Sequence, residues 1–160
     1  MRHIKYIFLS VVFLLVQMNV AHLLTVEGIT PDILIIWVVY LSLKEGQTAG
    51  TIWGFCIGLA FDIATGGFIG LSALTKTICG FSTGFFYNEN KTLITLSSYR
   101  FLVAVLVASL IHNSIYFLVY TQGSDIGLAR AVLQVGLATT FYTTTWTLLP
   151  MLAFARRTIA

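Results

Sequence analysis

Long apolar stretches alternate with short polar breaks along the whole chain, and this pattern predicts helices that share a lipid bilayer. Six stretches are present, at about residues 4–24, 31–43, 48–64, 71–87, 99–120 and 129–154. The breaks between them are too short for a soluble domain. We therefore expect an all-α integral membrane protein, with a single domain over residues 1–160 built as a six-helix transmembrane bundle.

The first two stretches raise questions of length. The first follows a basic N-terminal segment, as a signal peptide would, but its apolar character continues through Leu24, which favours an uncleaved helix. The second reaches only ~20 Å, against a hydrocarbon core of about 30 Å. Thr30 is expected to cap this helix and Pro31 to occupy its first position. Neighbouring helices must shield it, or the bilayer must thin around it.

Composition supports lipid as the solvent. Charged residues make up 9% of the chain and hydrophobic residues 58%, whereas soluble domains contain about 25% charged residues. The net charge of +3 comes without a basic stripe interleaved with aromatic residues, so nucleic-acid binding is not expected.

The basic residues predict the orientation, because cytoplasmic loops of membrane proteins are enriched in Lys and Arg. With the N-terminus in the cytoplasm, the outer loops contain only Arg130. The cytoplasmic ends then contain Arg2, Lys5, Lys44, Lys91, Arg100, Arg156 and Arg157. We expect a multi-pass membrane protein with both termini in the cytoplasm.

Gly50, Gly54 and Gly58 recur every four residues and share one face of the third predicted helix. Such a face lets two helix backbones approach closely in lipid, where van der Waals contact drives helix association. The spacing fits packing inside this chain and also fits docking of a partner's helix, and it does not separate these alternatives.

Two charged residues lie close to the predicted turn between the third and fourth helices. Asp62 precedes the glycine-dense segment from Gly66 to Gly70, which we place at the outer surface, and Lys76 lies about 8 Å into the fourth helix. We expect Lys76 to pair with Asp62 or to extend its ammonium toward the surface. A transport site is the weaker alternative.

The fifth helix has a polar stripe near its middle that includes His112 and Asn113. Such a stripe faces protein or a cavity, and not lipid. We expect hydrogen bonds to Gln17 and Asn19 of the first helix or to the threonines of the sixth. No acidic partner for His112 is apparent, and no nucleophile elbow or zinc-protease motif is present. We therefore expect no catalytic residue, cofactor or metal site.

The order of these features resembles the MreD family of bacterial rod shape-determining proteins. The most specific part runs from Pro31 to Gly80. It comprises Thr30-Pro31-Asp32 before an aliphatic helix, then Gly46, Gly50 and Gly58, then Gly58-Leu59-x2-Asp62-x3-Gly66-x3-Gly70-Leu71-x-Ala73-Leu74. Leu149-Pro150 and Arg156-Arg157 near the C-terminus also agree.

The resemblance implies a non-enzymatic scaffold in the bacterial inner membrane, part of the cell-elongation machinery that builds lateral peptidoglycan. Such proteins associate with the bitopic protein MreC and, through it, with MreB, RodA and a penicillin-binding protein. The family's motif residues in this sequence are Pro31, Asp32, Gly50, Gly58, Asp62, Gly66 and Gly70. Lys76 is not part of that pattern. Our leading hypothesis is that the glycine face and the adjoining outer turn dock a neighbouring membrane protein.

Two other functions remain open. MreD-like proteins are similar in topology to the substrate-binding S components of energy-coupling-factor transporters, so vitamin uptake is the alternative. The first helix counts against it, because its small residues Ser10 and Ala21 lack the four-residue spacing that such families use for docking. An enzyme acting on lipid or wall precursors through His112 or Asp62 is less favoured, because no residue that would orient a general base is apparent.

Overall fold

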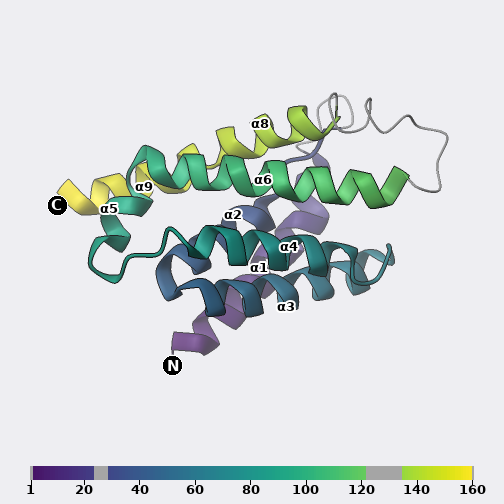
Figure 1. The fold of residues 1–160 in the computed structure, drawn as a ribbon, viewed down its shortest axis with the longest axis horizontal. Coiled ribbons are helices and arrows are strands. Elements are labelled where there is room, and N and C mark those ends of the chain that lie inside the picture. The colour runs from purple at the N-terminus through teal and green to yellow at the C-terminus, as the bar shows by residue number, and fades with distance from the viewer. Residues whose placement is uncertain (1, 24–28, 122–134, 160) are drawn as a thin grey trace.

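The computed structural model describes residues 2–23, 29–121 and 135–159, and this part of the chain is helical almost throughout. The helices are α1 (Arg2–Leu23), α2 (Ile33–Glu45), α3 (Gln47–Thr65), α4 (Leu71–Gly84), the 3-10 helix η1 (Glu89–Lys91), α5 (Thr92–Leu96), α6 (Tyr99–Tyr120), α8 (Leu137–Trp146) and α9 (Leu148–Ile159). The all-α class is confirmed for these residues. Figure 1 shows α3, α4, α6 and α8 running along the long axis, with α1 crossing obliquely.

The short helix α2 lies at the centre of the molecule. Leu34, Val38, Val39 and Leu41 are all fully buried, and α2 contacts α1, α3, α4, α6 and α8. A helix with no polar face suits this position, because every side meets another apolar surface. Of the two solutions expected for its length, the structure shows shielding by neighbouring helices.

The start of α2 differs from the sequence expectation. Asp32 is the N-cap, and its carboxylate accepts a hydrogen bond from the backbone amide of Ile35. Thr30 and Pro31 therefore lie before the helix, which begins at Ile33. The expectation that Thr30 caps the helix is wrong, because the carboxylate of Asp32 satisfies the free amides of the first turn.

The last apolar stretch is broken into two helices. α8 ends at Trp146 and α9 begins at Leu148. Pro150 explains the position of the break, because a proline ring clashes with the carbonyl four residues earlier, which here belongs to Trp146. Residues 129–134 of the predicted stretch lie outside the described residues.

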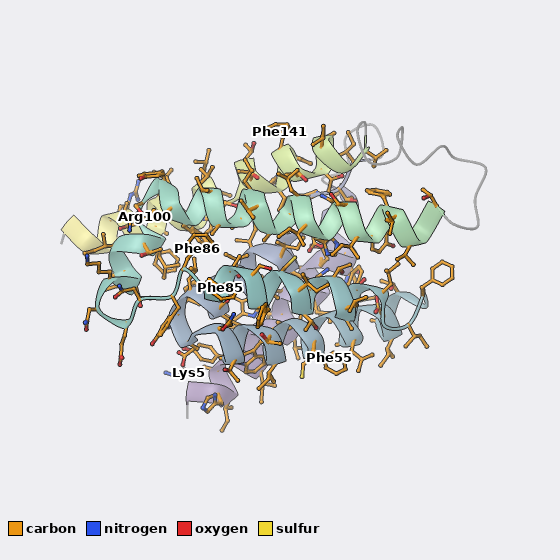
Figure 2. All side chains as sticks on the ribbon, in the orientation of Figure 1. Lys5, Phe55, Phe85, Phe86, Arg100 and Phe141 are labelled. Carbon is orange, nitrogen blue, oxygen red and sulfur yellow. The ribbon has the colours of Figure 1, made fainter. Side chains whose placement is uncertain are left out.

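The outer surface is apolar. Among the described residues, α3 and the span Tyr99–Val119 of α6 are long and apolar enough to cross a membrane. Figure 2 shows Phe55 and Phe141 pointing away from the bundle on opposite sides, and their side chains are 50% and 63% exposed. Contact with lipid accounts for such side chains better than contact with water does.

The connections divide between the two ends of the bundle. In Figure 1 both termini, the α2–α3 turn and α5 lie toward the left, whereas the α3–α4 turn lies toward the right. The termini therefore lie toward the same end of the molecule.

Candidate functional site

The polar side chains predicted as candidate site residues gather in two places, and the first is the turn between α3 and α4. Asp62 is 3% exposed. Its carboxylate accepts hydrogen bonds from the backbone amides of Gly70 (2.9 Å), Ser72 (3.1 Å) and Ala73 (3.2 Å). These amides begin α4 and have no acceptor within their own helix. Their positive partial charge stabilises the buried carboxylate in turn.

The glycines of this turn supply its backbone conformation. Gly66 ends α3 with φ +66°, and its amide donates to the carbonyl of Asp62. Gly70 precedes α4 with φ +98°. A Cβ at either position would meet no atom within 4 Å, so the requirement for glycine comes from the left-handed backbone and not from space. Asp62-x3-Gly66-x3-Gly70 is therefore a sequence pattern that builds a tight helix hairpin.

The glycine face of α3 is covered within this chain. Gly50, Gly54 and Gly58 are buried. A Cβ on each would collide with Ser42 of α2 at Gly50, with the carbonyl of Lys76 at Gly54, and with the carbonyl of Ser72 at Gly58. Internal packing, one of the two alternatives left open by the sequence, describes these contacts. They leave no room for a partner's helix on the same face.

The second gathering surrounds Asp32, where several helices meet. The ammonium of Lys76 in α4 lies 2.9 Å from the Asp32 carboxylate, and Nε2 of His112 in α6 lies 3.5 Å from the same oxygen. The backbone amide of Asp32 donates to the hydroxyl of Thr143 in α8 at 3.0 Å. Lys76 is 1% exposed and His112 is 6% exposed. We call Asp32, Lys76, His112 and Thr143 the Asp32 cluster.

α1 is joined to the same point through Gln17. Its side-chain amide donates to the carbonyl of Pro31 at 3.1 Å, and its side-chain oxygen accepts from the amide of Ile33 at 2.8 Å. The residues just before α2 have no helical partners of their own, so Gln17 replaces two missing hydrogen bonds. Polar contacts thus tie the beginning of α2 to α1, α4, α6 and α8.

Lys76 therefore has a different partner from the one expected. The sequence favoured Asp62, which is nearer along the chain, or a side chain extended to the surface. In the structure the Asp62 carboxylate is occupied by the amides of α4, and Lys76 is buried against Asp32. The ammonium also lies 5.3 Å from the ring centroid of Phe61. The Asp62–Lys76 pair is corrected to an Asp32–Lys76 pair.

The expected hydrogen bonds between the polar stripe of the fifth predicted helix and the threonines of the sixth are confirmed for Asn113. Its side-chain amide donates to the carbonyl of Gly136 at 3.2 Å and to the hydroxyl of Thr140 at 2.9 Å, and so links α6 to α8. His112 differs, because it does have an acidic neighbour in Asp32. In the described part of the chain, the buried Oγ of Ser109 and Nδ1 of His112 have no hydrogen-bond partner.

The Asp32 cluster is enclosed by the helices that it joins. Three surface cavities, of about 640, 350 and 440 Å³, are lined by other residues, so none of them brings a substrate to Asp32 or His112. The carboxylate is already engaged by Lys76 and by the amide of Ile35. Among the described residues, no group of three or more His, Cys, Asp or Glu side chains is placed to hold a metal ion.

Comparison with known proteins identifies the family. A family model described as rod shape-determining protein MreD matches residues 1–155. Searches against curated proteins and against solved structures gave no significant match. The family match covers both the Asp32 cluster and the α3–α4 turn. This chain therefore belongs to the MreD family of rod shape-determining proteins.

Proposed function

We propose that this protein is a non-enzymatic scaffold of the bacterial cell-elongation machinery, embedded in the inner membrane. The family match over residues 1–155 carries the proposal. The structure supports it in two respects: the exterior is apolar, and the buried polar residues join helices to one another. Both features suit a rigid membrane body that positions other proteins.

The proposed topology has several membrane crossings and cytoplasmic termini. The excess of Lys and Arg in the loops assigned to the cytoplasm favours this orientation. The arrangement of the chain supports it, because both termini lie toward one end of the bundle and the α3–α4 turn toward the other (Figure 1). The α3–α4 turn then faces the outside of the cell.

The partner proposed for this body is MreC, which would connect it to MreB, RodA and a penicillin-binding protein. We assign the docking surface to the tip of the α3–α4 turn. Phe68 and Ile69 are 67% and 75% exposed there, while Asp62 and Gly70 hold the backbone beneath them. A rigid turn that presents two apolar side chains loses little conformational entropy when a partner covers it.

Depletion of the protein tests the cellular role. A rod-shaped bacterium that makes this protein should become rounder and wider as the protein is lost, because lateral wall synthesis would lose its membrane scaffold. Light microscopy of cell width against length measures the effect, and a plasmid copy should restore rods. Cells that keep their rod shape after verified depletion would refute the elongation role.

Substitution at the turn tests the docking surface. The double change Phe68→Ser and Ile69→Ser should weaken the binding of MreC roughly a hundred-fold and so remove most of the MreC that co-purifies. Burying two large apolar side chains contributes about 3 kcal/mol or more, and about 1.4 kcal/mol corresponds to a factor of ten in affinity. The matched control is Phe55→Ser, which removes an exposed aromatic ring from the side of the bundle. Unchanged co-purification of the double variant, or an equal loss in the control, would place docking elsewhere.

A further inference from the structure

An open groove runs along α2 on the side of the molecule where α1 lies. Its volume is about 640 Å³, which lies in the range of small-molecule and lipid-chain pockets. Phe13 of α1 forms one wall, Trp37 of α2 forms the floor, and Trp146 and Phe154 form the opposite wall. α1 contacts α2 and α3, and Figure 1 shows it crossing the bundle obliquely.

One end of the groove is cationic. Lys5 and Lys44 both line it. The Lys44 ammonium donates a hydrogen bond to the hydroxyl of Tyr40 at 2.9 Å and lies 5.4 Å from the ring centroid of Tyr6. The nearby carboxylate of Glu45 instead accepts the hydroxyl of Tyr6 at 2.6 Å. The ion pairs found among the described residues join Asp32 to Lys76 and to His112 and do not involve Lys5 or Lys44.

The length of the groove matches one leaflet of a bilayer. Lys5 and Val16 bound it along α1, and Ile33 and Lys44 bound it along α2. At the rise of an α-helix, each pair is separated by about 16 Å along its helix axis. The hydrocarbon core is about 30 Å thick, so one leaflet is about 15 Å. A transmembrane helix of a partner would need a groove about twice as long.

We propose that this groove binds an anionic phospholipid from the leaflet on the side of Lys5 and Lys44. The phosphate contacts the two ammonium groups, and one acyl chain follows the aromatic floor past Trp37. Charge complementarity at one end and an apolar channel one leaflet deep together select this ligand. The inference rests on the membrane placement proposed above, and it assigns a site that scaffolding alone does not require.

Tryptophan fluorescence provides the test, because two of the three tryptophans, Trp37 and Trp146, line the groove. The full chain with Trp53→Phe is reconstituted into phosphatidylcholine vesicles that contain phosphatidylglycerol, with brominated chains on one lipid or the other. Brominated phosphatidylglycerol should quench more strongly than brominated phosphatidylcholine at equal mole fraction. Lys5→Gln and Lys44→Gln should each lower this preference roughly five-fold, as expected for the loss of one cation near the headgroup.

Two variants separate the groove from general surface charge. Lys91→Gln removes a positive charge from η1, outside the groove, and should keep the preference for phosphatidylglycerol. Ala153→Phe fills the groove while retaining both lysines, and should abolish the preference.

The outcomes also distinguish the site from the membrane placement. Equal quenching by the two lipids in the parent protein would overturn the anionic site while supporting the placement in a membrane. A preference that survives both lysine changes would overturn the site as well. Absence of quenching by either lipid would overturn both.

Discussion

Lys76→Met should lower the midpoint of thermal unfolding in detergent by roughly 10 °C. The change leaves the carboxylate of Asp32 without its ammonium partner at 2.9 Å, in the interior of the helix bundle. Removing one partner of a buried ion pair costs about 3–5 kcal/mol, and each kcal/mol shifts the midpoint of a protein of this size by about 2–4 °C. Loss of tryptophan fluorescence intensity on heating measures the midpoint.

A double variant separates the ion pair from the packing of the lysine stem. Asp32→Asn combined with Lys76→Met removes both charges, and asparagine is as good an N-cap as aspartate, so the hydrogen bond to Ile35 is retained. This variant should recover most of the lost stability. A single variant as stable as the parent protein would contradict the buried pair, as would a double variant less stable than Lys76→Met alone.

The Asp32 cluster could have been predicted from the sequence by comparing the depth of each residue in the membrane. Distance along the chain was the wrong criterion. α2 is about 10 Å shorter than the hydrocarbon core, so in the proposed topology its beginning lies below the membrane surface. Lys76 lies about 8 Å from the start of α4, and His112 about 12 Å from the end of α6. Equal depth therefore predicts that Asp32, Lys76 and His112 meet. Proximity along the chain favoured Asp62 and was misleading.

Local patterns were better guides where they encode backbone geometry. Gly66 and Gly70 predict a tight turn, and the structure shows both with positive φ. Pro150 predicts a disturbed helix, and the break falls at its i−4 carbonyl. The role of Asp62 was missed because a carboxylate that caps the next helix from eight residues away depends on how the turn folds back. The docking of MreC at this turn stays a prediction.

Small residues carry no information about which helix covers them. Gly50, Gly54 and Gly58 fit any close neighbour, and the choice of α4 depends on the length of the connecting turn. Gly80 of α4 lies against the carbonyl of Gly50, so both helices contribute glycine to this contact. Among the described helices, α3 and α4 make the most extensive contact with each other, and this contact supports the turn that we assign to MreC.

Gly54→Leu should leave little folded protein. A Cβ at this position would overlap the backbone carbonyl of Lys76, and a helix backbone cannot move aside as a flexible side chain does. Even Gly54→Ala should cost about 3 kcal/mol, the upper end of the range for overpacked cores. The yield of monodisperse protein from size-exclusion chromatography and the midpoint of thermal unfolding measure the effect.

The matched control for Gly54 is Gly67→Ala, two residues after the end of α3. A Cβ at Gly67 would have the hydroxyl of Thr65 at 3.8 Å as its nearest contact, so stability should change by less than about 1 kcal/mol.

The pair of variants also decides between the two roles of the glycine face, internal packing and docking of a partner. If Gly54→Leu folds normally and loses only MreC, the face docks a partner. If it fails to fold while Gly67→Ala stays stable, the face packs α3 against α4, and MreC must bind another surface.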